Sequence, residues 1–376
     1  MHEDRRTFLA KVGTVGVVGV AGCTGGPSDE ETPTETPAGD DEMGTGTDEE
    51  TESSDPTQVG MVYAAGGLGD GSFNDQAQQG LFDAEEEFEL EYQEAQPEAV
   101  GEFGTFQQQF AESSDPDYDL VCCIGFLQTD ALTSTAENYP DQQFMLVDSV
   151  VDASNVASYT FKEHEGSFLV GQLAGTLTTR EFEAGGGATV ADSTGVGFVG
   201  GVESDLIRKF EAGFTAGVGN ADGDVEVLTN YVGDFNDPAG GKEAALSMYD
   251  EGADVVYHAA GNTGTGVFQA AQEEGRFAIG VDRDQSVTKD SFQDVILASM
   301  VKRVDTAVYG AIEATVEGSF EGGSVVSLGL ERDGVDIVYG QQLGSEIDAE
   351  VTDAIATSRQ AIIDGDVSVP TDPDEA

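Results

Sequence analysis

Short loops that follow expected β-strands carry most of the side chains that could hold a ligand. One such loop is rich in glycine and ends in Phe73, Asn74 and Asp75. Its glycines would let the backbone approach a ligand, the ring could cover a flat group, and the two polar side chains could hydrogen-bond to it. The glycine spacing does not fit the G-x-G-x-x-G fingerprint of dinucleotide sites. We therefore interpret this loop as a contact for a small ligand.

Aromatic residues occur in two more of these loops, and a further loop offers backbone N–H groups. Gly125 and Phe126 follow one expected strand, and Phe235 follows another. Such rings can simply cover the core, but two or three converging on one cleft would enclose a flat heterocycle. Gly261 and Asn262 open an expected helix, where N–H groups either contact a ligand or belong to an ordinary helix cap. Of the two aromatic residues, Phe235 is the stronger candidate.

A carboxylate and a lysine complete the candidate site. Asp282 lies at a strand end, where it could accept two hydrogen bonds from a vicinal diol, a common way of holding a sugar ring. Lys302, one of six lysines, follows the next expected strand and could donate to a ligand hydroxyl while Asp282 neutralises its charge. The alternative is a surface lysine paired with a local acid such as Asp305. The set predicts an uncharged solute with hydroxyl groups.

Sequence patterns for catalysis, metal binding and cofactor binding are weak. No Ser/His/Asp or Cys/His set is apparent, the three histidines do not cluster, and no G-x-x-x-x-G-K-[ST] loop occurs. Cys122 and Cys123 are adjacent on an apolar strand, so we expect both to be buried and unpaired. We expect no catalytic residue, no metal and no cofactor. The alternative is an enzyme acting on nucleosides or sugars, with Asp75, Asp282 and Lys302 as base and electrophile.

Acidic residues outnumber basic ones along the whole chain. The 376 residues include 73 Asp and Glu against 15 Lys and Arg, a net charge of -58. Self-repulsion of this size destabilises a compact state in dilute buffer, whereas molar salt shortens the Debye length to about 3 Å and removes most of the penalty. The composition is typical of a protein from an extreme halophile. It argues against nucleic acid as a partner and against anionic ligands.

Short β-branched runs alternate with longer helical patterns from Val59 onward, which indicates βαβ units and parallel sheets. The expected strands are 59–64, 89–94, 119–124, 143–147 and 156–161, and then 195–199, 225–231, 254–258, 277–281 and 295–299. The expected helices are near 76–88, 102–113 and 128–138, and near 204–217, 239–251 and 264–274. About 320 ordered residues exceed what one core usually organises, and the pattern restarts midway. We therefore predict an α/β fold of two doubly wound parallel-sheet lobes with a ligand cleft between them.

Three chain segments are expected to connect the lobes. A helix near 163–181 would open the second lobe, and a helix near 304–318 would return to the first. The second lobe would be completed by strands 325–330 and 335–339 and a helix near 346–364. The predicted boundaries are 58–161 with 300–322 for the first lobe, 162–299 with 323–366 for the second, and 367–376 for an acidic tail. A three-segment hinge of this kind resembles that of type I periplasmic solute-binding proteins.

The N-terminus resembles the leader of a twin-arginine lipoprotein. Arg5-Arg6 precedes a short apolar run that ends at Cys23, although Asp4 stands where such leaders usually have Ser or Thr. We predict a signal peptide at 1–22, removed so that the acylated cysteine holds the protein on the outer face of the cell membrane. Residues 23–57 would form an acidic, disordered tether. The alternatives are a loose N-terminal arm and an acidic interaction tail.

Five motifs together resemble the basic membrane lipoprotein family of solute-binding proteins, which includes PnrA-like purine-nucleoside receptors of ABC importers. They fall within a match of roughly residues 58–366 and are Gly71-Ser72-Phe73-Asn74-Asp75, Phe210-Glu211-Ala212-Gly213-Phe214, Gly233-Asp234-Phe235-Asn236-Asp237-Pro238, Ala260-Gly261-Asn262-Thr263-Gly264 and Gly280-Val281-Asp282-Arg283-Asp284-Gln285.

The resemblance implies a role for several matched positions. Asp282 and Lys302 would bind ribose hydroxyls. Phe235 and a residue among 73–75 would flank or hydrogen-bond the base, and Gly261 would add backbone contacts. No second lysine lies nearby, so the polarity on the ribose side would rest on Lys302 alone.

The expected function is that of a receptor without enzymatic activity. A lipid-anchored monomer would capture a nucleoside, with purine nucleosides favoured, between hinged lobes, and closure would create the surface that docks to ABC permease subunits in the membrane. ATP hydrolysis would belong to other chains. Besides the enzyme described above, a ligand-sensing receptor for a signalling partner is the alternative.

Overall fold

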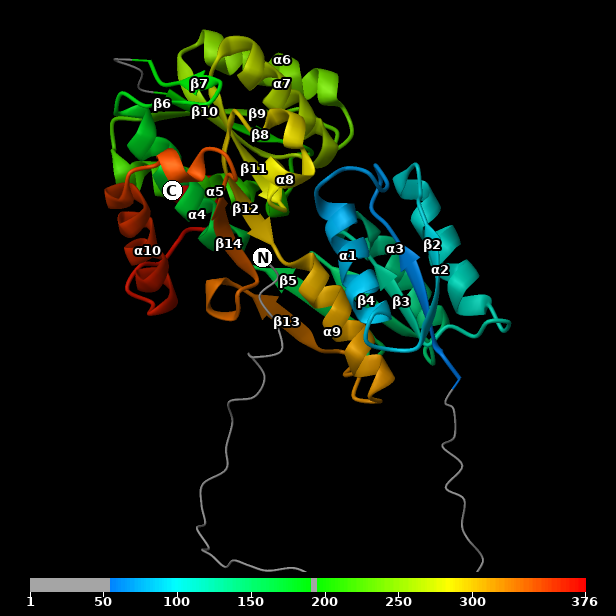
Figure 1. The fold of residues 1–376 in the computed structure, drawn as a ribbon. Coiled ribbons are helices and arrows are strands. Elements are labelled where there is room, and N and C mark those ends of the chain that lie inside the picture. Colours follow the sequence, from blue (N-terminus) through cyan, green and yellow to red (C-terminus); the bar gives the residue numbers. More distant parts are fainter. Residues whose placement is uncertain (1–54, 191–194) are drawn as a thin grey trace, which may run out of the picture. The chain divides into compact units, whose positions relative to one another are not determined.

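Two six-stranded sheets organise the described residues, 55–190 and 195–376, of this computed structural model (Figure 1). Each of the ten strands expected before residue 300 is present, with ends shifted by three residues or fewer. The α/β prediction with two lobes is confirmed. The predicted signal peptide, Cys23 and nearly all of the predicted tether lie outside the described residues, although the first strand begins at Thr57.

The first sheet has the strand order β13-β5-β4-β3-β1-β2, and all neighbouring pairs are parallel. Its strands are β1 (Thr57–Val62), β2 (Leu90–Ala95), β3 (Leu120–Cys123), β4 (Gln143–Val147), β5 (Val156–Phe161) and β13 (Val325–Leu328).

Helices cover both faces of this sheet, and the two adjacent cysteines show how. Side chains of a strand alternate between faces. Cys122 packs in the cluster that includes α1 (Phe73–Glu85) and α9 (Val304–Val316), whereas Cys123 packs with α2 (Phe103–Glu112) and α3 (Thr129–Asn138). Both cysteines are buried and free, as predicted.

The second sheet has the strand order β14-β12-β11-β10-β8-β9. Its strands are β8 (Gly195–Gly200), β9 (Glu226–Tyr231), β10 (Ala253–Ala259), β11 (Phe277–Asp282), β12 (Ile296–Lys302) and β14 (Val335–Tyr339). The helices around it are α4 (Glu163–Thr178), α5 (Asp205–Ala221), α6 (Pro238–Asp250), α7 (Gly264–Glu274), the short α8 (Gln285–Thr288) and α10 (Ala349–Ile363). The lobe is not purely parallel, because β14 runs antiparallel to β12.

Two predicted boundaries are wrong. The first part of the second lobe was expected to end at residue 299, but β12 continues through Lys302, which pairs with Val335 in the second sheet. The strand at 325–328 was assigned to the second lobe, but it pairs in parallel with β5 of the first sheet, Val325 opposite Ser158. Helix α9 has returned the chain to the first lobe, and the next segment covers the edge that β5 would otherwise expose. The third crossing therefore lies between β13 and β14, and the other two lie between β5 and α4 and between β12 and α9.

Helices α4 and α5 pack with their backbones in near contact. A Cβ atom at Gly213 would lie 2.2 Å from the carbonyl oxygen of His164, and one at Gly217 would lie 2.1 Å from that of Phe168. No side chain larger than a hydrogen atom fits at either position. These glycines fix the distance between the helix that opens the second lobe and its neighbour.

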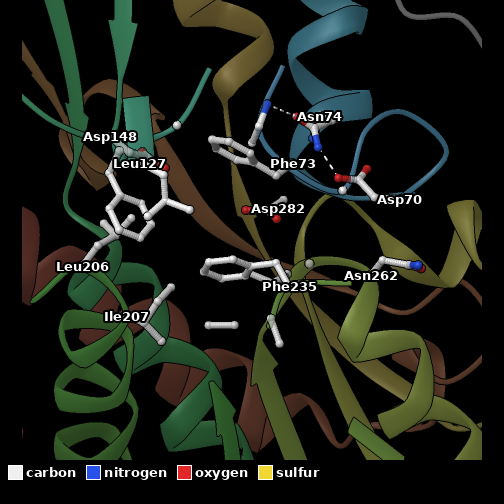
Figure 2. Close-up of a pocket in the computed structure, with 18 of the residues that line it drawn as sticks. Asp70, Phe73, Asn74, Leu127, Asp148, Leu206, Ile207, Phe235, Asn262 and Asp282 are labelled. Carbon is white, nitrogen blue, oxygen red and sulfur yellow. Dashed lines mark hydrogen bonds between the residues drawn. The ribbon is translucent and has the colours of Figure 1, made fainter. Parts of the chain in front are cut away.

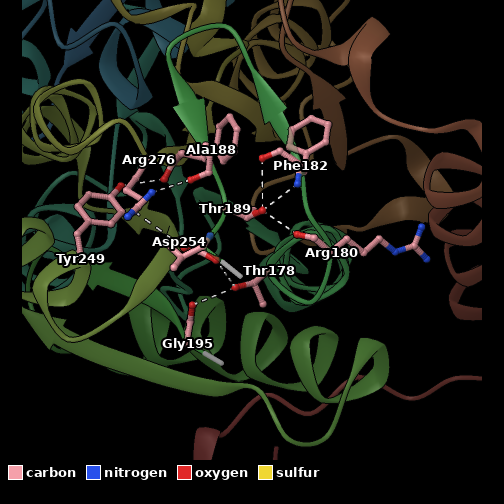
Figure 3. Close-up of polar contacts among 11 residues, drawn as sticks. Thr178, Arg180, Phe182, Ala188, Thr189, Gly195, Tyr249, Asp254 and Arg276 are labelled. Carbon is pink, nitrogen blue, oxygen red and sulfur yellow. Dashed lines mark hydrogen bonds and ion pairs between the residues drawn. The ribbon is translucent and has the colours of Figure 1, made fainter. Parts of the chain in front are cut away.

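A small hairpin, β6 (Glu183–Ala184) with β7 (Gly187–Ala188), was not predicted. Figure 3 shows how it is tied to the second sheet through buried Asp254 at the start of β10. Thr178 Oγ1 donates to Asp254 Oδ2 at 2.9 Å, and Arg276 Nη1 donates to the carbonyl oxygen of Ala188 at 3.0 Å. Arg276 Nε lies 4.0 Å from Asp254 Oδ1. Buried polar groups join helix, hairpin and sheet here.

The predicted acidic tail, 367–376, is not free of the second lobe. Arg208 Nη2 on α5 lies 2.9 Å from Asp372 Oδ1, and the Val369 side chain is buried. An acidic segment can pack here because Arg208 offers it a cation.

Among the described residues, none of the helices combines the length and the apolar character needed to span a bilayer.

Candidate ligand-binding site

A pocket lies where the carboxyl ends of strands from both sheets meet (Figure 2). Its volume is about 80 Å³ of space open to the centres of water molecules, several times the roughly 10–15 Å³ that one water needs. Nine of the ten predicted ligand-binding residues line it: Phe73, Asn74, Gly125, Phe126, Phe235, Gly261, Asn262, Asp282 and Lys302. The rule that ligands bind at strand ends therefore selected residues that are far apart in the sequence, from 73 to 302, and that the fold places around one pocket.

Asp75 does not line the pocket. Its two carboxylate oxygens accept the backbone N–H groups of Gly69 at 2.7 Å and Gly71 at 2.8 Å. Both glycines have positive φ, +87° and +62°, so the loop needs glycine at these positions. Asp75 thus fixes the glycine-rich loop instead of facing the pocket.

Asn74 lines the pocket, but its side chain is engaged by its own loop. Its Oδ1 accepts the N–H of Ala64 at 2.9 Å, and its Nδ2 donates to the carbonyl oxygen of Gly67 at 3.0 Å. Asn262 is held in a similar way, since its Nδ2 donates to Asn236 Oδ1 at 2.8 Å. Both amides shape the pocket wall.

Aromatic rings from both lobes face the pocket. The rings of Phe126 and Phe235 meet edge to face, with centroids 6.3 Å apart and planes at 80°. The Phe73 ring lies 5.1 Å from Lys302 Nζ, a cation–π distance. Gly125, with φ of +106°, brings the backbone against the Phe73 ring, and its Cβ would lie 3.4 Å from that ring. The predicted convergence of three rings is therefore present.

Lys302 is almost completely buried, and its counter-ions differ from the prediction. Its Nζ lies 2.6 Å from Asp148 Oδ1 and 3.2 Å from Glu163 Oε1. Burial alone would lower the pKa of Lys302, but Asp148, Glu163 and then Asp282 outweigh it and raise that pKa. Asp282 therefore acts on the lysine only through the field of its charge. The surface-lysine alternative is wrong, since Asp305 is paired with Arg303.

A second lysine belongs to the same cluster. Lys209 Nζ on α5 lies 2.9 Å from Glu163 Oε2 and donates to the carbonyl oxygen of Phe161 at 3.2 Å. Charges therefore alternate along Asp148, Lys302, Glu163 and Lys209. The expectation that no second lysine lies nearby is wrong, because α5 brings in one that is distant in sequence.

Asp282 is buried at the end of β11, with φ of +65°. Its Oδ2 accepts a hydrogen bond from Ser72 Oγ. Burial raises the pKa of Asp282 to about 7, although Lys302 and the Ser72 hydrogen bond act in the opposite direction. Non-glycine residues with positive φ are strained and concentrate at functional sites. A carboxyl group with a pKa near neutrality faces the pocket here.

Sequence reasoning missed Asp148, Asp70 and Phe210, which also line the pocket. Asp148 directly follows β4 and has φ of +71°, so the strand-end rule applied to every strand would have found it. Burial raises the pKa of Asp148, while Lys302 lowers it. Phe210 lies in one of the five family motifs but on a helix, where the rule for loops does not look.

The histidines and acidic residues that the structure describes are not arranged as a metal site. Within 55–190 and 195–376, no group of three or more His, Cys, Asp or Glu side chains could hold a metal ion. His258 is buried in β10 with its Nε2 2.9 Å from Gln285 Oε1. Burial lowers the pKa of His258 to about 3, so the ring is neutral.

Two lobes around a pocket at their strand ends define the class of periplasmic-type solute-binding proteins, and the comparisons agree. A crystal structure of ABC transporter system solute-binding proteins from Aeropyrum pernix K1 is similar to this chain, with a TM-score of 0.73 and 30% identity over 85% of this chain and 95% of that one. The ABC transporter nucleoside-binding protein BmpA of Lactococcus lactis subsp. cremoris is 34% identical over 84% of this chain and 89% of that protein. An uncharacterized lipoprotein of Pyrococcus abyssi is 33% identical over 78% of this chain and 71% of that protein.

The model of the PnrA-like family of ABC transporter substrate-binding proteins matches residues 57–372. The chain belongs to this family, as the sequence motifs indicated.

Proposed function

We propose that the protein is a lipid-anchored receptor that binds a nucleoside, with purine nucleosides favoured, and delivers it to an ABC permease. The observation that carries the proposal is the presence of two kinds of side chain in one pocket. Asp282, Lys302 and Asp148 supply polar groups, and Phe73, Phe126 and Phe235 supply aromatic rings. A ribose offers hydroxyl donors and acceptors to the first, and a base offers a flat face to the second.

Charge supports an uncharged solute. The pocket holds three carboxyl groups, Asp70, Asp148 and Asp282, against Lys302. A phosphate group would meet these carboxylates and the field of a chain with net charge -58. A nucleoside avoids this repulsion, whereas a nucleotide does not. The name of the Lactococcus relative, a nucleoside-binding protein, agrees with this choice.

We propose binding without chemical conversion. The enzyme alternative needed Asp75 in the cleft, and that carboxylate instead holds the glycine-rich loop. His258 lies near the carboxyl end of β10, but its ring is buried and neutral and hydrogen-bonds to Gln285. A receptor needs only to close on its solute, and we propose that the residues lining the pocket make the contacts.

We propose that the mature chain is attached at Cys23 to the outer face of the membrane after export by the twin-arginine route. The relative from Pyrococcus abyssi is named a lipoprotein, which supports attachment. One chain supplies every residue that lines the pocket, so no second copy is needed to form it and we propose a monomer.

Isothermal titration in molar potassium chloride tests the proposal. The panel contains adenosine, guanosine, inosine, cytidine and uridine, with the free bases, ribose and the 5′-monophosphates as controls. We expect heat of binding from purine nucleosides, none from the monophosphates, and no new product by chromatography after prolonged incubation. Binding of ribose alone, or release of free base, would contradict the proposed function.

A further inference from the structure

Ser72 stands at the N-cap position of α1, yet its side chain does not cap that helix. An N-cap serine normally accepts a backbone N–H from the first turn. Here Asp70 accepts those groups, from Asn74 at 2.9 Å and from Asp75 at 3.3 Å. The fully buried Ser72 hydroxyl donates instead to Asp282, 210 positions away in the second lobe. Ser72 therefore does not cap its own helix but donates its hydroxyl to the pocket carboxylate of Asp282.

Further hydrogen bonds join the lobes next to Ser72. Thr288 Oγ1 donates to the carbonyl oxygen of Gly71 at 2.8 Å, and Gln285 Nε2 lies 3.4 Å from the same oxygen. Gln285 is held in place by the N–H of Val281 at 2.8 Å. Neither Gln285 nor Thr288 lines the pocket. The Ser72 bond is thus the member of this set that ends on a pocket residue.

The Ser72 bond also restricts what Asp282 can offer. A carboxylate has about four lone-pair positions, and its plane rotates unless a partner fixes it. Ser72 occupies one position on Oδ2, which fixes the plane and leaves Oδ1 for a ligand. If the lobes separate, Ser72 leaves with the first lobe and the carboxylate is free to turn.

We propose that Ser72 determines specificity for hydroxyl groups and couples it to lobe closure: its hydroxyl orients Asp282 for the solute's ribose only when the lobes are closed. The inference rests on the proposed function, because it takes Asp282 as the group that holds the ribose. It adds a residue whose role is to position Asp282 and not to touch the solute.

Three variants test it by isothermal titration in molar potassium chloride, with adenosine and guanosine and their 2′-deoxy counterparts. Ser72→Ala removes the hydroxyl and should weaken ribonucleoside binding about tenfold or more, the effect of losing a hydrogen bond to a charged group. It should also reduce the preference for the ribonucleoside over the deoxynucleoside. Ser72→Thr keeps a hydroxyl and should restore both. Thr288→Val removes a contact between the lobes outside the pocket, so it should weaken both ligands equally.

A pH profile provides a readout that a merely structural role would not move. Burial is the largest influence on the pKa of Asp282 and raises it, and the charges of Asp70 and Asp148 act in the same direction. Lys302 and the hydroxyl of Ser72 lower that pKa. Ser72→Ala should therefore shift the midpoint of binding against pH upward, whereas Thr288→Val should leave it in place. Carbon-13 NMR of the Asp282 carboxyl group at saturating nucleoside measures the same midpoint in the closed protein.

The outcomes separate the two proposals. A Ser72→Ala protein with the wild-type preference for ribonucleosides and an unshifted midpoint overturns the inference and leaves the proposed function standing. A wild-type protein that binds no nucleoside overturns the proposed function and, with it, the specificity role.

Discussion

Lys302 Nζ and Asp148 Oδ1 lie 2.6 Å apart, so an ion pair joins the end of β12 in the second lobe to the residue after β4 in the first. Both side chains are almost fully buried, and both line the pocket. The pair therefore links the charge of the ligand site to the contact between the lobes.

Lys302→Met should both destabilise the fold and abolish nucleoside binding. Removing one partner of a buried ion pair leaves an uncompensated charge and costs about 3–5 kcal/mol. Here Asp148 would lose its lysine, whereas Glu163 would keep only Lys209. Urea unfolding in molar salt measures the loss. Lys242→Met is the matched control, because its pair with Glu273 is exposed and should contribute less than about 1 kcal/mol. Equal stability of the two variants would show that the buried cluster contributes little.

Phe235→Leu should weaken purine-nucleoside binding with little change in stability. A base stacked on an aromatic ring gains about 1–3 kcal/mol, which corresponds to roughly tenfold to a hundredfold in affinity. Phe182→Leu is the control, since that ring packs on Phe277 with centroids 5.4 Å apart, outside the pocket. Isothermal titration of both variants would show a loss for Phe235→Leu alone. A loss common to both would point to a general packing effect.

Binding should strengthen as the pH rises through about 7, because an ionised Asp282 accepts hydrogen bonds from hydroxyl groups better than a neutral one. Stability should respond in the opposite sense. The pKa of Asp282 is raised in the fold from its ordinary value of 3.8, so its contribution to stability is full below that value and is lost as pH rises through about 7. Titrations and melting curves between pH 5 and 9 check both trends.

Asp282→Asn is the control for this pH dependence, since an amide of the same size has no proton to lose. Its affinity should be low and independent of pH across this range. A wild-type affinity that stays constant from pH 5 to pH 9 would contradict the role of Asp282 in holding hydroxyl groups.

Dialysis from molar to millimolar salt should unfold the domain. At low ionic strength the Debye length grows to about 30 Å at 0.01 M, so charges across the whole domain repel one another under a net charge of -58. Circular dichroism at each salt concentration follows the transition, and addition of the nucleoside should shift its midpoint to lower salt. A spectrum unchanged by dialysis would contradict the halophilic interpretation.

Cys23→Ser should release the protein from the membrane fraction into the medium without changing its affinity for nucleosides. The acyl chains on the cysteine would be lost, and the charge of the chain gives no reason for it to stay on an anionic membrane. Replacing Arg5-Arg6 by a pair of lysines should instead retain an unprocessed precursor inside the cell. Fractionation with immunoblotting separates the two results. A Cys23→Ser protein that stays on the membrane would contradict anchoring at this residue.

The fold could be predicted from the sequence wherever a periodic pattern is local. The strand at 143–147 and the helix at α7 were placed correctly because β-branched runs and helical spacing are readable within one segment. The partner of β13 was not predictable in this way. Its sequence is compatible with either sheet, and the pairing with β5 depends on where α9 leaves the chain.

The candidate site was likewise predictable where the sequence signal is local and not where it depends on packing between distant segments. Strand-end loops identified Asp282 and Phe235, which are close in space because parallel strands end on one edge. The hydrogen-bond partners could not be predicted. Asp75 and Ser72 have similar sequence surroundings, yet Asp75 bonds to its own loop and Ser72 bonds to the pocket residue Asp282. Lys209 reached the cluster only through the packing of α5, which no local pattern records.

The glycines that bring α4 and α5 into near contact have a mechanical consequence. Helix α4 starts at the first crossing between the lobes, and α5 carries Ile207 and Phe210 into the pocket wall. With Gly213 and Gly217 leaving no gap between the two helices, they act as one lever. A rotation at this crossing would therefore carry Ile207 and Phe210, and with them that wall of the pocket, through the same angle.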